Sequence, residues 1–216
     1  MLDEGGMRKS KWYQLVGEDF VAKAFEYANE AAPEAELYYN DYNLWKPEKR
    51  KAAIDLVTSL QENNVPIDGI GMQAHLGIDG PSIEMVEESI QAFSELGIKV
   101  MITELDIDVL PRRGDVSADV GAAEDADDTV PEALNPYEES LPDSVQQQLT
   151  DRYMELFELF NKHRDKIDRV TFWGLNDGQS WLNNFPIRGR TNYPLLFNRE
   201  YEGKPALEAV IGLTKD

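Results

Sequence analysis

Two acidic residues follow a mostly apolar stretch at positions 100–103. Glu104 and Asp106 stand two positions apart, so in an extended strand both side chains point to the same side. A charge in a buried strand costs free energy unless it is paired or serves a reaction. Carboxylates in such a place can act as nucleophile or as general acid and base. A structural carboxylate in an ion pair is the alternative interpretation of Glu104.

A histidine ends the apolar segment that precedes this strand in the chain. His75 closes residues 67–75, and we expect this segment to lie beside the strand that carries Glu104 and Asp106. An imidazole between two carboxylates can orient one of them and keep it ionised. A histidine satisfied inside the core is the alternative, but the coincidence with Glu104 on adjacent strand ends favours the catalytic interpretation.

Aromatic residues near the same strand ends suit a sugar substrate. Pyranose rings expose apolar C–H faces, and Trp and Tyr offer large flat apolar faces on which these can stack. The candidates are Trp173, Trp181 and Tyr42, with core packing as the alternative. We expect Trp12 and Trp45 to belong to packing or to a contact between a helix and a loop.

These candidates stand at the ends of apolar, β-rich segments. The predicted strands are residues 36–40, 67–75, 99–105 and 169–175. Continuous apolar runs are typical of strands buried on both faces, as in parallel sheets. Helical periodicity occupies residues 18–30, 47–63, 82–96, 140–166 and 205–213. Alternation of strands and helices predicts a parallel α/β sheet.

One long connection interrupts this alternation. Residues 112–143 are rich in acidic residues, with Gly, Pro, Ala and Asn, so we expect a loop insertion after the third predicted strand. Ser140 and Asp143 have the spacing of a capping box that would begin the next helix. Loops that leave the C-terminal ends of barrel strands often carry functional residues. An insertion without a function is an equally favoured interpretation of residues 112–143.

The predicted fold class is α/β, as the C-terminal half of a (β/α)8 TIM barrel. A complete barrel takes about 250 residues and eight strands, whereas this chain has 216 residues and only four legible strands. We expect residues 1–216 to form one portion of a domain, corresponding to about strands 5–8. Half a barrel leaves edge strands exposed, so a missing N-terminal half or a second copy should cover them.

Composition restricts the partners. The net charge of −20 disfavours nucleic acid and anionic membranes, which need a basic face, and favours a neutral or cationic substrate. No apolar run approaches the roughly 20 residues of a membrane helix, and residues 1–10 have no apolar stretch typical of a signal peptide. Cysteine is absent, which excludes disulfides and thiolate metal sites.

No metal site and no cofactor are predicted. His163 lies on a predicted helix between two basic residues, where we expect it to be solvated and to play no part beside His75. The acidic loop lacks the spacing of an EF-hand, although it could hold calcium in another arrangement. Residues 69–74 formally match the G-x-G-x-x-A pattern of dinucleotide-binding proteins. That fingerprint opens a helix, whereas here the segment continues a strand.

Five segments resemble signatures of glycoside hydrolase family 10, the endo-β-1,4-xylanases. They are residues 37–43 (LYYNDYN), 69–76 (GIGMQAHL), 101–107 (MITELDI), 170–182 (VTFWGLNDGQSWL) and 186–197 (PIRGRTNYPLLF). The resemblance covers nearly the whole chain apart from the acidic loop. It implies the C-terminal portion of a catalytic barrel that cleaves internal β-1,4 bonds of xylan or xylo-oligosaccharides with retention. It also implies a secreted, periplasmic or cell-surface location.

The resemblance assigns roles residue by residue. It implies that Glu104 is the nucleophile and that His75 and Asp106 hydrogen-bond to it and orient it. The substrate contacts that it implies are Gln73, Trp173, Trp181, Tyr42, Asn43 and Arg190. The first three belong to the sugar before the cleaved bond, and the next two belong to the leaving-group side. Arg190 lines the same cleft.

The general acid/base of the family is missing from this sequence. It lies in a Trp-Asp-x-x-Asn-Glu motif on the fourth barrel strand, and no such motif occurs here. Glu4 lacks the preceding Asn, so we do not assign it this role. We expect the acid to come from upstream residues or another chain, and the 216 residues alone to be inactive. The alternative function is a non-catalytic, xylan-binding half barrel, and a different β-glucan stays open as substrate.

Overall fold

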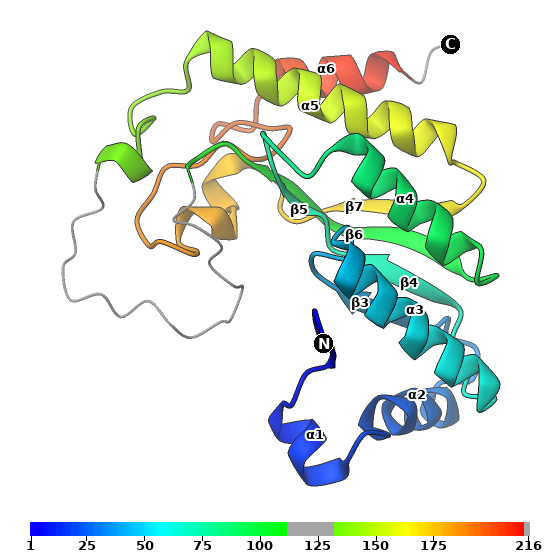
Figure 1. The fold of residues 1–216 in the computed structure, drawn as a ribbon. Helices are drawn as coiled ribbons and strands as arrows, with labels where there is room; N and C mark the ends of the chain where they lie inside the picture. The colour runs from blue at the N-terminus through cyan, green and yellow to red at the C-terminus, as the bar shows by residue number, and fades with distance from the viewer. Residues whose placement is uncertain (112–131, 214–216) are drawn as a thin grey trace. The chain divides into compact units, whose positions relative to one another are not determined.

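The computed structural model describes residues 1–111 and 132–213 (Figure 1), so most of the predicted acidic loop lies outside the described residues. The chain divides into two compact units. The first unit comprises Met1–Ala74, Pro81–Leu105 and Phe160–Thr171, and the second comprises His75–Gly80, Asp106–Leu159 and Phe172–Asp216.

The first unit is built on a parallel sheet. β3 (Tyr38–Asp41) pairs with β4 (Gly69–Met72), and β4 pairs with the first part of β6 (Lys99–Asp108). Both pairs are parallel, with Tyr38 opposite Gly69 and Gly69 opposite Lys99. β7 (Ile167–Phe172) also pairs with β6. The parallel sheet predicted from the alternation of strands and helices is therefore confirmed.

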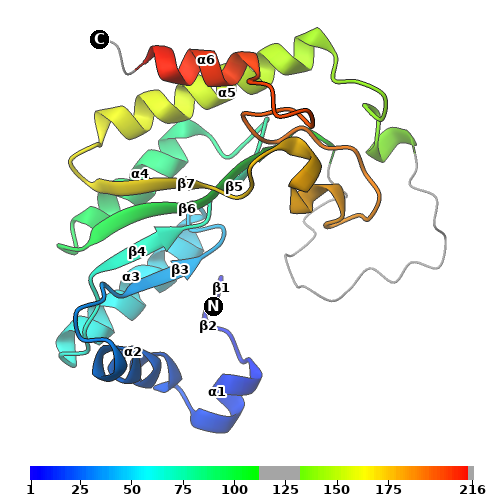
Figure 2. The same ribbon diagram turned by 180° about the vertical axis from the view of Figure 1, so that it is seen from behind.

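Two helices cover one face of this sheet. α3 (Pro47–Glu62) and α4 (Ile83–Ser94) lie in front of the strands in Figure 1 and behind them in Figure 2. Pro47 suits the first turn of α3 because its fixed φ is already helical. The hydroxyl of Ser82 caps α4 by accepting a hydrogen bond from the amide of Met85. The fully buried residues between these helices and the sheet include Ala53, Val57, Ile70, Ile90, Phe93, Val100 and Ile102.

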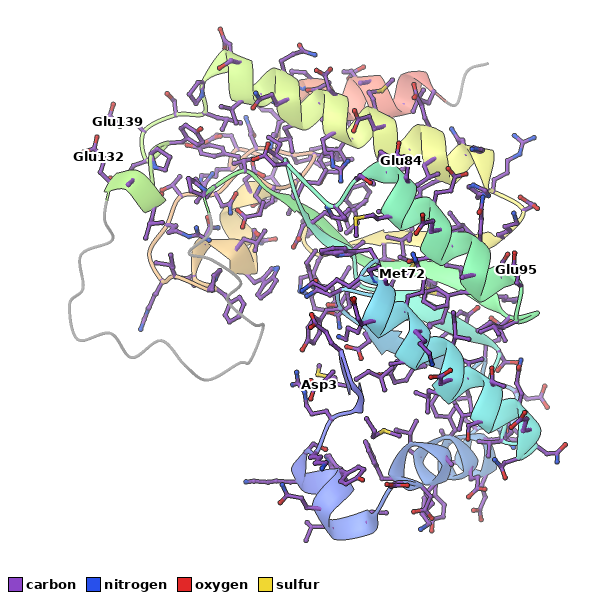
Figure 3. All side chains as sticks on the ribbon, viewed as in Figure 1. Asp3, Met72, Glu84, Glu95, Glu132 and Glu139 are labelled. Carbon is purple, nitrogen blue, oxygen red and sulfur yellow. The ribbon has the colours of Figure 1, made fainter. Side chains whose placement is uncertain are left out.

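The N-terminal residues contain structure that their polar composition did not predict. β1 (Leu2–Asp3) and β2 (Gly6–Met7) form a short antiparallel hairpin, where Figure 3 labels Asp3. α1 (Lys11–Val16) follows, and then α2 (Phe20–Ala31). Leu2 is buried, and its amide donates to the Asp41 carboxylate at 2.7 Å. This long-range bond ties the hairpin to the end of β3, although the sequence offers no apolar run there.

The second unit begins with β5 (His75–Gly77), which pairs in parallel with the end of β6. α5 (Asp143–Lys162) buries Leu149, Tyr153, Leu156 and Leu159 in this unit, and α6 (Pro205–Gly212) runs beside it (Figures 1 and 2). The hydroxyl of Tyr153 donates to the carbonyl of Pro194 at 2.6 Å, which satisfies the polar end of a wholly buried ring. The described part of this unit also contains three short 3-10 turns: Glu132–Leu134, Asp177–Gln179 and Trp181–Asn183.

Two predicted boundaries were wrong. The strand predicted over residues 67–75 is two strands, β4 and β5, because Ala74 has a φ of 60° and the left-handed conformation breaks the extended chain. α5 begins at Asp143, so Ser140 and Asp143 do not form the predicted capping box. Within residues 1–111 and 132–213, no helix has both the length and the apolar character to cross a membrane.

Two predicted side-chain environments were also wrong. Trp12 does not pack, since it is 69% exposed on α1. His163 is not solvated, because the turn after α5 buries it against α4 and its Nε2 lies 2.6 Å from the Glu87 carboxylate. Figure 3 labels Glu84 and Glu95 near the two ends of the same α4 helix, where both are exposed.

Candidate functional site

In the first unit, an amide holds the carboxylate of Glu104. Asn40 Nδ2 donates to Glu104 Oε1 at 2.8 Å, and the hydroxyl of Thr103 donates to Asn40 Oδ1 at 2.7 Å. A carboxylate can only accept, so the Asn40 amide must turn its NH2 group toward Glu104. The Thr103 hydroxyl satisfies the opposite end of the amide. Asn40 and Thr103 are functional candidates that the predicted site did not include.

The backbone places these groups at the carboxyl ends of neighbouring strands. The amide of Glu104 donates to the carbonyl of Gln73 at 2.9 Å, and the amide of Gln73 donates to that of Asp41 at 3.1 Å. These bonds continue the ladder of β3, β4 and β6 beyond β4. They bring Gln73 beside Glu104 in this unit.

Glycine at position 71 makes room for the same group of side chains. A Cβ there would lie 2.6 Å from Asn40 Oδ1 and 2.8 Å from Thr103 Cγ2. Real Cβ atoms do not approach other atoms so closely. The amide that holds Glu104 therefore depends on a missing side chain on β4.

A buried ion pair anchors the segment that carries Tyr42 and Asn43. Lys49 Nζ lies 3.0 Å from Asp41 Oδ1, and both side chains are almost wholly buried. Lys49 also donates to the carbonyl of Tyr42 at 2.6 Å. Burial lowers the pKa of Lys49, and the neighbouring Asp41 charge opposes that change. The segment after β3 is thus held from inside the unit.

Tyr42 and Asn43 follow directly from this anchor. The hydroxyl of Tyr42 accepts a hydrogen bond from Arg8, and its ring lies 3.3 Å from Lys49 Nζ. Burial raises the pKa of Tyr42. Asn43 has a φ of 54°, a left-handed conformation that asparagine tolerates better than most residues. The turn that follows β3 and the contacts to Arg8 and Lys49 therefore hold Tyr42 and Asn43 at this strand end.

In the second unit, His75 and Asp106 are paired. They stand opposite each other in the register of β5 and β6, and His75 Nδ1 lies 3.0 Å from Asp106 Oδ1. The indole N–H of Trp181 donates to the other oxygen, Oδ2, at 2.8 Å. Asp106 is wholly buried, and burial raises its pKa, whereas the hydrogen bonds to His75 and Trp181 act in the opposite direction.

Aromatic rings surround this pair. Trp173 meets the His75 ring edge to face at 6.4 Å between centroids, and Trp173 itself is 47% exposed. Trp181 lies 4.8 Å from His75 and stacks on Phe185 at the same distance. A half-exposed Trp beside a polar group offers a flat apolar face that a sugar ring can use.

Arg190 occupies a different environment from the other candidates. Its side chain is 3% exposed, and Nη1 donates to the carbonyl of Pro111 at 3.1 Å. This contact holds the chain that leaves β6. No group of three or more His, Asp or Glu residues that could hold a metal ion occurs within residues 1–111 and 132–213.

The structure thus gathers the candidates in two sets. Glu104 and Gln73 lie together in the first unit, with Tyr42 and Asn43 on its neighbouring strand end. The second unit brings together His75, Asp106, Trp173 and Trp181. Chemically, the first set offers a partly exposed carboxylate with a fixed orientation, and the second offers a buried carboxylate that fixes an imidazole.

Comparison with known proteins adds a family likeness. Residues 1–213 match the sequence profile of Glycosyl hydrolase family 10. Endo-1,4-beta-xylanase A of Xylanibacter ruminicola is 42% identical over 214 residues, which is 99% of this chain and 57% of that protein. The chain therefore spans well under two thirds of the length of this relative.

Solved structures give the same picture. A family 10 endoxylanase retrieved from a sugarcane soil metagenome is 44% identical, with a TM-score of 0.90 over 99% of this chain and 60% of that chain. A second structure, solved in complex with xylotriose, is 32% identical, with a TM-score of 0.81 over 97% of this chain and 58% of that one.

Proposed function

Because the chain belongs to glycosyl hydrolase family 10, we propose that it forms the nucleophile-bearing part of a retaining endo-1,4-β-xylanase. Its relatives are named endo-1,4-beta-xylanases, and their barrel is the fold that its structural neighbours share. The observation that carries the proposal is the contrast between two carboxyls on β6. Glu104 is partly exposed and held by an amide, whereas Asp106 is wholly buried beside an imidazole. Enzymes divide roles between carboxyls by such differences in environment.

Glu104 is the proposed nucleophile. It attacks the anomeric carbon, the glycosidic bond breaks, and a covalent glycosyl-enzyme forms with the leaving oxygen protonated by a second carboxyl. That second carboxyl then takes a proton from water, which releases the sugar with its configuration retained. In this proposal, His75 and Asp106 orient Glu104 and provide charged groups close to it.

The remaining candidates are proposed to bind the substrate. Gln73, Trp173 and Trp181 take the sugar on the glycone side, and Tyr42 and Asn43 take the leaving-group side, with Arg190 supporting the same cleft. A neutral polysaccharide is compatible with the net charge of −20, which would repel an anionic polymer. We also propose a secreted, periplasmic or cell-surface location, because a polymer such as xylan does not cross a membrane intact.

The second carboxyl is proposed to lie outside these 216 residues. The Trp-Asp-x-x-Asn-Glu motif is absent from the sequence, and the chain covers 57% of its Xylanibacter relative. We propose that the chain corresponds to about strands 5–8 of the barrel and that the other strands supply the acid. The isolated chain would then bind xylo-oligosaccharides weakly and hydrolyse xylan little or not at all.

A chimera tests this proposal. The part of the Xylanibacter ruminicola xylanase that this chain does not match is fused before residue 1, and release of reducing sugar from xylan is measured. We expect hydrolysis by the chimera and at least a roughly 1,000-fold loss in Glu104→Gln, because the nucleophile contributes to both chemical steps. Glu95→Gln is the matched control, since Glu95 is an exposed carboxylate at the C-terminal end of α4 (Figure 3).

Each outcome decides between the candidate roles. Hydrolysis that survives Glu104→Gln would refute the assignment of the nucleophile. A chimera that binds xylo-oligosaccharides without hydrolysing them would support the non-catalytic alternative. Robust hydrolysis by the 216-residue chain alone would contradict the proposed external acid.

A further inference from the structure

The indole of Trp181 is held on several sides within the second unit. Its Nε1–H donates to Asp106 Oδ2 at 2.8 Å. Its ring stacks on Phe185 at 4.8 Å with an angle of 17° between the planes, and the His75 ring lies 4.8 Å away at 57°. The face of the ring can cover a sugar, and its N–H edge is engaged with a buried carboxylate. The geometry therefore gives Trp181 a second task.

Asp106 is the group that receives this hydrogen bond. It is wholly buried, and its other oxygen lies 3.0 Å from His75 Nδ1. Burial raises the pKa of Asp106, and the nearby charge of Asp108 acts in the same direction, whereas His75 and Trp181 oppose it. Tyr153 of α5 also lies within reach of its charge. Each hydrogen bond that Asp106 accepts therefore favours its ionised form.

We propose that Trp181 is a positioning residue, whose indole N–H keeps Asp106 ionised and thereby fixes the tautomer of His75. This inference deepens the proposed function and rests on it for its catalytic meaning. An ionised Asp106 can only accept, so His75 must present Nδ1–H to it. A protonated Asp106 can donate to a bare Nδ1 and so permits the other tautomer. The indole can only donate, and it bonds more strongly to a carboxylate than to a carboxylic acid, so it favours the first arrangement.

Nuclear magnetic resonance of the 216-residue chain tests the inference without any substrate. The sequence has two histidines, so ¹⁵N-labelled imidazoles give two sets of signals, and the variant His163→Gln assigns them. We expect Nδ1 of His75 to be the protonated nitrogen of the neutral ring at neutral pH. On acidification, its signals should change with the protonation of Asp106, which is followed through the Asp106 carboxyl carbon.

Trp181→Phe removes the N–H and keeps an aromatic ring. Loss of one hydrogen bond to a charged group should raise the midpoint of the Asp106 titration by about one to two pH units. The coupled change at His75 should move with it. Trp173→Phe is the matched control. The Trp173 ring lies edge to face with His75 at 6.4 Å between centroids, whereas the indole that donates to Asp106 is that of Trp181. Its Asp106 midpoint should stay near that of the unmodified chain.

Two results would overturn the inference. One is an unchanged Asp106 midpoint in Trp181→Phe, and the other is an equal shift in Trp173→Phe. If Trp181→Phe does not fold, the unmodified chain provides the test. The sequence has four tryptophans, and the signal of the Trp181 indole proton is followed against pH. It must change with the same midpoint as the signals of His75. Different midpoints would refute the coupling. A chimera without hydrolysis would instead refute the proposed function and leave this coupling standing.

Discussion

At the scale of single residues, the environment of Glu104 depends on an amide that is 64 positions away in sequence. Asn40 donates to the carboxylate, and Thr103 satisfies the other end of Asn40. A hydrogen bond to an ionised group is worth about 1.5–3 kcal/mol. An amide fixed at both ends therefore orients the proposed nucleophile without adding charge to it.

Replacing this amide by its isosteric acid should change the pH dependence of activity. Asn40→Asp places a second carboxylate where Nδ2 now lies, 2.8 Å from Glu104 Oε1. Two carboxylates so close do not both ionise readily, so the acidic limb of kcat/KM in the chimera should move up by about one pH unit or more. Asn161→Asp adds the same charge at an exposed site on α5 and is the control. An acidic limb that stays in place would show that Asn40 does not support Glu104.

At the scale of elements, β4 contributes to the site by what it lacks. Gly71→Ala would push a Cβ against Asn40 Oδ1 and Thr103 Cγ2. Overpacking of this kind costs about 1–3 kcal/mol, and here it also displaces the amide that holds Glu104. We expect a lower midpoint in urea unfolding together with a lower kcat in the chimera. Gly80→Ala is the control, because a Cβ there meets nothing within 4 Å; equal effects of the two changes would refute this role of Gly71.

The loop that carries Trp181 rests on a second buried ion pair. Lys204 Nζ lies 3.0 Å from Asp177 Oδ2 and also donates to the carbonyl of Tyr193. The amide of Leu195 donates to Asp177 as well. Burial raises the pKa of Asp177 and lowers that of Lys204, so each charge depends on the other. This pair ties the 3-10 turn at Asp177–Gln179 to the segment before α6.

Removing the cation should destabilise the second unit strongly. Lys204→Met leaves the Asp177 charge buried without its partner, which costs about 3–5 kcal/mol in the free energy of unfolding. The folded state then binds a proton at Asp177 more tightly than the unfolded state, so the loss should shrink as the pH falls. Urea unfolding at neutral and acidic pH measures both effects. Lys51→Met, which breaks an exposed pair with Asp55, should cost under about 1 kcal/mol; a similar loss in both variants would contradict the argument.

At the scale of the whole molecule, one edge of the sheet and the first two helices expose surfaces that favour association with another chain. β3 ends the strand order of the described sheet, and Trp12, Leu15 and Tyr27 are more than half exposed. Unpaired edge strands and exposed apolar side chains favour pairing with another chain. The missing strands proposed above would cover such an edge in the complete enzyme.

The isolated chain should therefore self-associate. We expect light scattering coupled to size-exclusion chromatography to show dimers or larger species that grow with concentration. The chimera is the control, and it should elute as a monomer because its added strands pair with the edge. A sharp monomer peak for the 216-residue chain at high concentration would contradict the predicted exposed edge.

The sequence by itself determined the parallel α/β class, the ranges of α2 to α6 to within a few residues, and the order of the strands near which the candidate residues stand. These are local properties, because an apolar run or a helical period is complete within one segment. The family also followed from local motifs, since segments such as residues 37–43 and 101–107 each keep their own signature. The roles of Glu104 and His75 stay predictions that the chimera can test.

Only the tertiary structure decided which side chains support these residues. The Thr103–Asn40 bond joins residues 63 positions apart, and the Trp181–Asp106 bond joins residues 75 positions apart. The sequence around either residue of such a pair does not indicate its partner, because the contact forms only when strands and loops pack together. The same reason explains why the burial of His163 against α4 was not predicted. Sequence periodicity selects which face of an element is buried, and packing then selects the partner.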